Sequence, residues 1–255
     1  MFTFLICFIA GIGAGLGTGF AGMSAAAVIS PMLITFLGLP AYEAVGIALA
    51  SDVLASAVSA YTYGKNKNLD IGNGIVMMIT VLLFTLVGSL AASLVPNATM
   101  GGFSVFMTLL LGIKFIVKPV MTTKESMEGV SARKRIFQSI LSGTVVGFIC
   151  GFIGAGGGMM MLLLLTGLLG YELKTAVGTS VFIMSFTAFT GAASHFVIGG
   201  MPDIRCLVFC VASTLLWARI AARFANKASA ATLNRATGVV LAVLGVSILA
   251  VRYLQ

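Results

Sequence analysis

One carboxylate of this sequence falls well inside a predicted apolar helix, at Asp52. An ionised group is costly at that depth, and such residues usually mark an ion or proton pathway. Ser56 and Ser59 follow it on about the same helix face, so this face is hydrophilic. Two interpretations stay open for Asp52: a group that couples transport to protons, or a protonated structural carboxyl.

Two glycine-rich breaks interrupt stretches that are otherwise apolar enough for continuous helix. They are Gly22–Ala25 and Gly154–Gly158. A helix that begins after a break directs amide N–H groups and the positive end of its dipole toward one point, which suits an anion. We therefore predict a small anion between the two breaks, bound by backbone groups and hydroxyls of Gly22, Ser24, Ser51, Ala155, Gly156, Gly157, Gly158, Thr179 and Ser180.

Other glycines favour a purely structural interpretation. Small residues spaced four apart let helices approach closely. We assign this packing role to Gly11, Gly15, Gly143 and Gly147.

Two further polar residues are expected near the outer ends of helices. His195 is the sole histidine, and an interfacial role and proton handling both stay open for it. Arg205 either attracts an anion at the outer mouth or extends to lipid headgroups. No catalytic triad, metal-ligand cluster or phosphate-binding loop is apparent, so the sequence predicts no enzyme, no metal and no cofactor. The cysteines are expected to act as small hydrophobic residues: Cys7, Cys150, Cys206 and Cys210.

The composition requires these residues to be positioned by membrane-embedded helices. Of 255 residues, 59% are hydrophobic and 9% are charged. Soluble domains are about 45–50% hydrophobic and about 25% charged. This excludes a soluble enzyme, a disordered chain and a disulfide-stapled secreted module. At roughly 20 residues per span, the chain has room for about eight to ten membrane segments. The net charge of +8 comes mostly from residues that flank apolar stretches, so it does not indicate a nucleic-acid partner.

The sequence also contains an internal duplication. Residues 11–64 align without a gap on residues 143–196, with shared glycines and a shared Ala-Val-Gly. We predict a first repeat over 1–118, a cytoplasmic linker over 119–135 and a second repeat over 136–255. Each repeat is a Gly-broken hairpin followed by three spanning helices. The expected helices are 2–19, 23–37, 41–63, 71–95 and 98–118, then 136–151, 159–169, 174–197, 204–225 and 230–251.

Loop charges indicate how the repeats are oriented. Basic residues gather in the loop 64–70 and in the region 219–235, whereas loops 95–102 and 198–203 have none. Placing the basic regions and the linker in the cytoplasm makes the two copies inverted. Inverted repeats with interrupted helices are typical of secondary transporters, whose substrate site lies near the bilayer midplane. A parallel duplication with incidental charges is the alternative.

The duplicated motifs resemble the sulfite exporter TauE/SafE family, also called the toluenesulfonate uptake permease family. The resemblance rests on Gly147-x-x-x-Gly151-x-x-Gly154-Ala155-Gly156-Gly157-Gly158 followed by Ala176–Ser180. The first copy matches more loosely, with Ser24–Ala27 where a fuller glycine run is common. The resemblance implies a multi-pass transporter of the bacterial inner membrane. It also implies a sulfur-containing oxoanion as substrate: sulfite, a sulfonate such as sulfoacetate, or thiosulfate.

We therefore expect an all-α secondary transporter built from two inverted repeats. Its expected partners are a small anionic substrate and the lipid bilayer, with a homodimer as a candidate assembly and no nucleic acid. A passive anion channel of the same fold is the main alternative. An intramembrane enzyme or a scaffold protein is a weaker one.

Overall fold

The fold comes from a computed structural model that describes residues 2–92, 113–114, 116–119, 131–153 and 157–253. The elements in this part of the chain are helices: α1 Phe2–Ala21, α2 Ala26–Leu37, α3 Ala41–Lys65, α4 Ile71–Ala92, α7 Ala132–Ile153, α8 Gly157–Gly167, α9 Leu173–Gly199, α10 Ile204–Lys227 and α11 Ala230–Tyr253. The prediction of an all-α fold is confirmed. Most of the predicted helix 98–118 lies outside the described residues. Helix α7 begins at Ala132 rather than at 136, because Arg and Lys are good helix formers.

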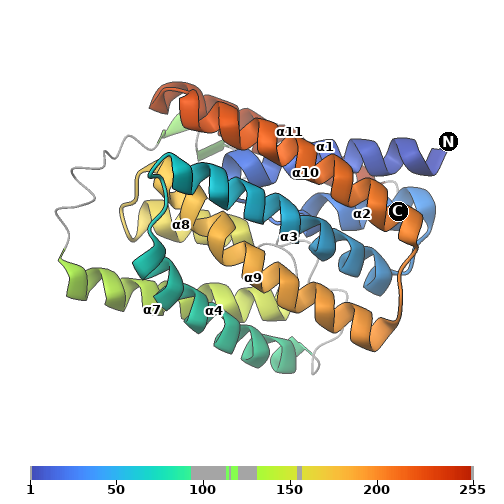
Figure 1. The fold of residues 1–255 in the computed structure, drawn as a ribbon, viewed down its shortest axis with the longest axis horizontal. Helices are drawn as coiled ribbons and strands as arrows, with labels where there is room; N and C mark the ends of the chain where they lie inside the picture. Colours follow the sequence, from blue (N-terminus) through green and yellow to red (C-terminus); the bar gives the residue numbers. More distant parts are fainter. Residues whose placement is uncertain (1, 93–112, 115, 120–130, 154–156, 254–255) are drawn as a thin grey trace.

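The helices pack in three layers (Figure 1). The pair α3 and α9 crosses the middle of the molecule, between a layer that contains α1 and α10 and a layer that contains α4 and α7. The short helices α2 and α8 follow the breaks and pack beside α3 and α9. The helices that carry the predicted site therefore lie at the centre of the molecule.

The glycines of α1 and α7 form two matching helix seams. A Cβ on Gly15 would lie 2.6 Å from the Thr214 carbonyl oxygen of α10, and a Cβ on Gly147 would lie 2.5 Å from the Val81 carbonyl oxygen of α4. Gly11 and Gly143 pack in the same way on those two helices, against Ser213 and Thr80. The packing role predicted for these four glycines is confirmed.

The turns after the short helices also match. Gly38 and Gly170 follow α2 and α8 and have φ values of 65° and 66°. The left-handed region is open to glycine without steric cost, and glycine commonly ends a helix there. The Leu39 and Tyr171 amides then bond back to the Leu33 and Leu165 carbonyls. Gly38 and Gly170 are equivalent positions in the alignment of residues 11–64 with residues 143–196, and so are the residues that form these hydrogen bonds. The two halves therefore share local geometry.

Polar contacts bring distant loops together at each end of the bundle. At one end, the Asn68 side chain donates to Asn226 at 2.7 Å, and Tyr171 donates to Asp70 at 2.7 Å. At the other end, the Asp203 amide donates to Glu43 at 2.7 Å. The loop 64–70 and the region 219–235, which together carry six of the 15 basic residues, therefore share one end.

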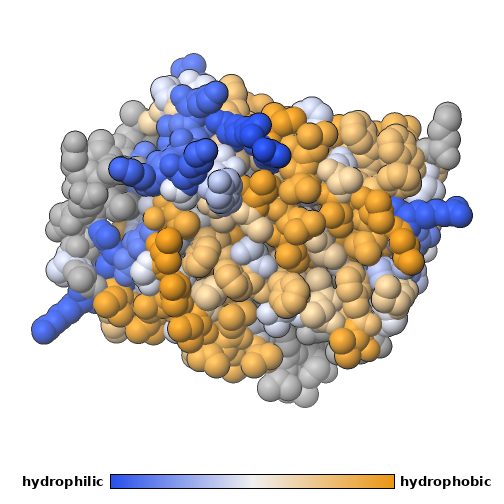
Figure 2. Space-filling view, viewed as in Figure 1, coloured by the Kyte–Doolittle hydropathy of each residue, from blue (hydrophilic) through white to orange (hydrophobic). Residues whose placement is uncertain are grey.

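The exterior of the bundle is apolar along its length. Five helices in the described ranges are long and apolar enough to cross a membrane: Phe2–Ala21, Glu43–Lys65, Leu173–Val197, Ile204–Lys227 and Ala230–Ser247. Figure 2 shows a broad hydrophobic band on one face, with hydrophilic patches toward both ends. Exposed side chains such as Leu83, Phe189 and Val243 are more than half accessible. A continuous apolar exterior of this kind fits a lipid environment.

Candidate functional site

The first break meets the start of α8 in the interior. Gly22 ends α1 with a φ of +61°, and α2 begins at Ala26. Gly158, in the first turn of α8, packs so closely on the Gly22 carbonyl that a Cβ there would clash with it and would lie 3.0 Å from the Ser24 nitrogen. The Ser180 hydroxyl of α9 lies between them, 3.2 Å from the Gly22 carbonyl oxygen and 3.5 Å from that of Gly158. The structure thus brings together Gly22, Ser24, Gly158 and Ser180, four of the residues proposed above as ligands of the anion.

Hydroxyl groups satisfy the carbonyl oxygens that the first break exposes. The last carbonyls of a helix have no intrahelical partner, and leaving them unbonded in an apolar interior is costly. Four hydroxyls donate to carbonyls between Gly19 and Met23. These bonds join Tyr63 to Gly19 at 2.9 Å, Thr237 to Phe20 at 3.2 Å, Ser180 to Gly22 at 3.2 Å and Thr18 to Met23 at 2.9 Å. These hydroxyls satisfy the carbonyls of the break, while the Ala26 N–H at the start of α2 donates to the Ser24 hydroxyl oxygen at 3.3 Å.

Asp52 of α3 faces that helix start. Its carboxylate is fully buried, and its Oδ1 accepts a hydrogen bond from Ser56 at 2.8 Å. The Ser24 hydroxyl and the Ala25 backbone N–H face the same carboxylate. Its Oδ2 has no hydrogen-bond partner in the described part of the chain. Asp52 is therefore adjacent to the first break, and one carboxylate oxygen is left to interact with something else.

The remaining predicted site residues lie in several places. Gly157 is buried in the first turn of α8, and Ala155 and Gly156 lie outside the described residues. The Ser51 hydroxyl bonds the Ile47 carbonyl of its own helix at 2.8 Å. Thr179 accepts a hydrogen bond from the Asp70 amide at 3.1 Å, which directs its hydroxyl away from the breaks.

His195 and Arg205 lie far from the breaks, at the end of the bundle marked by Glu43 and Asp203. His195 lines a small cavity of about 50 Å³ together with Glu43 and Gly46. Arg205 is exposed in the first turn of α10, where Asp203 caps its amide. Both residues lie near an end of their helices.

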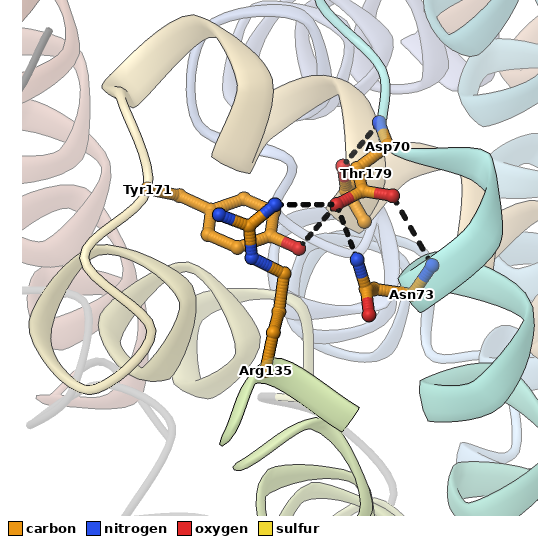
Figure 3. Close-up of polar contacts among 5 residues, drawn as sticks. All are labelled: Asp70, Asn73, Arg135, Tyr171 and Thr179. Carbon is orange, nitrogen blue, oxygen red and sulfur yellow. Dashed lines mark hydrogen bonds and ion pairs between the residues drawn. The ribbon is translucent and has the colours of Figure 1, made fainter. Parts of the chain in front are cut away.

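A second polar cluster, not predicted from the sequence, occupies the opposite end (Figure 3). It is centred on Asp70, whose two oxygens accept bonds from the Asn73 amide at 3.1 Å and from its side chain at 2.7 Å. The Tyr171 hydroxyl donates to the Asp70 carboxylate at 2.7 Å, and the Arg135 guanidinium lies 3.9 Å from it. Arg135 also lies over the Tyr171 ring, 5.7 Å from its centre. The cluster links α4 of the first repeat to α7 and the α8–α9 turn of the second.

The electrostatics of this cluster keep Tyr171 neutral. Burial raises the pKa of the Tyr171 phenol, and the hydrogen bond to the Asp70 carboxylate raises it further. The phenol therefore stays protonated and donates to Asp70 throughout the physiological pH range. Arg135 is the last of three consecutive basic residues, Arg133, Lys134 and Arg135, and it is less exposed than the other two.

The structure explains why the motif Ala176–Ser180 contains these residue types. Gly178 packs against the Asn68 carbonyl so closely that no Cβ would fit, Thr179 caps the Asp70 amide, and Ser180 bridges the breaks. Tyr63 is the main site residue that sequence reasoning missed. The duplication offers a signal for it, because Tyr63 aligns with the sole histidine, His195. Their surroundings match as well, since Gly178 packs on the Tyr63 Cβ and Gly46 on the His195 Cβ.

Among the described residues, no group of three or more His, Cys, Asp or Glu side chains could hold a metal ion. Cys7, Cys206 and Cys210 are free and buried, as expected for small hydrophobic residues. The Cys150 side chain lies outside the described residues.

Comparisons with known proteins identify a family and several proteins to which this chain is similar. The sequence model of the sulfite exporter TauE/SafE family matches residues 7–248. The chain is 21% identical over 235 residues to the "Probable membrane transporter protein YdhB" of Bacillus subtilis, covering 92% of this chain and 96% of that protein. It is 26% identical over 217 residues to "Probable membrane transporter protein YunE" of the same organism, covering 77% and 80%. A further relative is "Probable membrane transporter protein MJ0441" of Methanocaldococcus jannaschii, 28% identical over 199 residues, covering 75% and 70%.

The family match spans nearly the whole chain, from the first helix to the last. It agrees with the apolar exterior of the bundle and with the interrupted helices at its centre. The chain therefore belongs to the sulfite exporter TauE/SafE family of membrane transporters.

Proposed function

We propose that this transporter moves a small sulfur-containing oxoanion across the bacterial inner membrane. The substrate class comprises sulfite, sulfonates such as sulfoacetate, and thiosulfate. The anion binds where α2 and α8 begin, and Asp52 couples its movement to protons. The transporter has no enzymatic activity in this proposal.

One observation carries the proposal: two helix starts converge on one point in the interior. Gly158 of α8 lies against Gly22 and Ser24 of the first break, and Ser180 bonds the carbonyls on both sides. Amide N–H groups and positive dipole ends at a helix start stabilise anions. Because this coordination uses backbone and hydroxyl donors without a full positive charge, it favours release as well as binding.

The arrangement of the bundle supports an inverted relation between the repeats. Helix α1 runs inward from the end marked by Glu43, and α2 returns to that end. Helix α7 runs inward from the end marked by Asp70, and α8 returns there. Two broken hairpins that enter from opposite ends and meet at mid-depth are what alternating access around a fixed site requires.

The test of the proposal is anion flux in proteoliposomes that contain the purified full-length chain. We expect saturable uptake of labelled sulfite, competed by thiosulfate and sulfoacetate. Uptake of none of these anions above the level of empty liposomes would contradict the proposal. Flux that ignores an imposed proton gradient, at rates far above those of carriers, would identify a channel instead.

The variant Gly158→Ala tests the location of the site. Its Cβ would press on the Gly22 carbonyl and the Ser24 nitrogen. Overpacking of this kind costs about 1–3 kcal/mol, so we expect flux to fall about tenfold or more. The matched control is Gly167→Ala at the end of the same helix, where the nearest atom to a Cβ is the Lys114 Nζ at 4.0 Å. Equal flux in both variants and the wild type would place the anion elsewhere.

A further inference from the structure

The Asp52 carboxylate lies beside the helix start to which the proposed function assigns the substrate. Its Oδ1 accepts a hydrogen bond from Ser56 on its own helix, and the Ser24 hydroxyl and the Ala25 N–H at the start of α2 lie near enough to interact with the carboxylate. Ser24 and Ala25 belong to the helix start that the proposed function assigns to the anion. The protein therefore already holds a negative group of its own at this helix start.

Among the described residues, no charged group balances the charge of Asp52. The groups that face it, from α3 and from the break before α2, are uncharged, and no described charged side chain interacts with it. Its Oδ2 is fully buried and accepts no hydrogen bond from the described residues. A second anion at the same donors would meet this carboxylate at close range in a region of low dielectric, where repulsion between like charges is strong.

We propose that the Asp52 carboxylate competes with the substrate anion for the Ser24 hydroxyl and the Ala25 N–H, so that the anion binds only when Asp52 is protonated. This inference rests on the proposed function and gives its coupling a mechanism. A proton from water binds Oδ2 as the anion enters. The neutral carboxyl then releases the Ser24 hydroxyl and the Ala25 N–H, which become available to the anion. Proton and anion then leave together on the other side, after which the carboxylate returns to Ser24 and Ala25.

The second repeat has no counterpart of this carboxylate. The residue that aligns with Asp52 is Met184, which is buried at 5% exposure. Only one of the two helix starts is therefore occupied by an internal anion. The mechanism accordingly predicts that one proton accompanies each anion.

The first test compares substrate binding by the wild type and by Asp52→Asn as pH is varied. Thiosulfate is the probe, because it does not itself titrate in the neutral range. We expect wild-type affinity to fall about tenfold for each unit by which the pH rises above the carboxyl's own titration, as for any ligand whose binding requires one bound proton. Asp52→Asn carries no charge at this position, so its affinity should be high and independent of pH. The control Glu172→Gln removes an acid on the α8–α9 turn and should keep the wild-type pH dependence.

The second test measures protons directly, with a pH-sensitive dye inside wild-type proteoliposomes. It does not depend on whether the Asp52→Asn variant folds. A thiosulfate gradient should move one proton per anion. Thiosulfate flux that leaves the internal pH unchanged, or an Asp52→Asn variant with the pH dependence of the wild type, would overturn the competition while leaving the proposed function intact. The absence of both binding and flux for every oxoanion would overturn the two together.

Discussion

At the scale of single residues, the break after α1 is held by hydroxyl groups that come from four parts of the chain. Thr18 belongs to α1 itself, whereas Tyr63, Ser180 and Thr237 come from α3, α9 and α11. Each one bonds a carbonyl that the end of a helix leaves without a partner. Serine and threonine hydroxyls often bond only their own helix. Ser51 does so, and this is why it does not join the site despite lying next to Asp52.

Tyr63→Phe tests the importance of these caps. The variant keeps the buried ring but leaves the Gly19 carbonyl without its donor. An unsatisfied buried carbonyl costs about 1–3 kcal/mol, so we expect that loss in the free energy of unfolding. Denaturant unfolding in detergent measures it. Tyr61→Phe is the control on the same helix, because Tyr61 is 71% exposed, and an equal effect of both changes would argue against the cap.

At the scale of elements, two seams hold the broken hairpins to the rest of the bundle. Helix α1 packs along α10, and α7 packs along α4. Without a hydrophobic driving force between helices in lipid, close van der Waals contact is a main source of association. Glycines at the contacts allow that approach. The cluster around Asp70 adds hydrogen bonds and an ion pair where α4, α7 and the α8–α9 turn meet.

The packing of α1 predicts that alanine substitutions at its glycines destabilise the protein to different extents. A Cβ at Gly15 would meet backbone atoms of Thr214 and Ala218, which cannot move independently. A Cβ at Gly13 would meet only the side-chain ends of Leu244 and Val28, at 3.0 and 3.2 Å. We expect Gly15→Ala to destabilise the protein by about 1–3 kcal/mol and Gly13→Ala by less. Thermal unfolding of the two variants decides this, and a larger loss for Gly13→Ala would contradict the seam.

At the scale of the whole molecule, hydrophilic patches lie toward both ends of an apolar band on the face shown in Figure 2. The proposed transport cycle depends on which loops share an end. Asn68 bonds Asn226 across the two repeats, whereas Asp203 bonds Glu43 at the opposite end. These contacts group the basic loops together, as the positive-inside rule predicts for a cytoplasmic face.

Accessibility labelling tests this grouping in the membrane. Single cysteines replace Lys65, Lys227 and Met201, all exposed, in a variant without the native cysteines. We expect an impermeant reagent to label Lys65→Cys and Lys227→Cys from the cytoplasmic side and Met201→Cys from the other. Labelling of Lys65→Cys and Lys227→Cys from different sides would exclude the inverted arrangement.

The sequence by itself determined the membrane class, the two breaks and the approximate helix bounds. Charge content reflects the cost of transferring ionised groups into lipid, and glycine breaks reflect backbone sterics. Both features depend on short stretches of sequence, so they can be predicted without knowledge of the tertiary structure. The same local signals identified Gly22, Gly158 and Asp52 as candidates. The duplication, also visible in the sequence, predicted which segments are equivalent.

The tertiary structure alone decided which polar groups meet. Ser180 bonds the Gly22 carbonyl across 158 residues, and Thr237 bonds that of Phe20 across 217. Thr179 and Ser180 are neighbours in sequence, yet they serve different clusters, because successive side chains on a helix point in different directions. The polar cluster at Asp70 depends in the same way on contacts between segments far apart in the chain. Local spacing fixes the face of a helix on which a side chain lies, but only the packing of the whole chain fixes what that face meets.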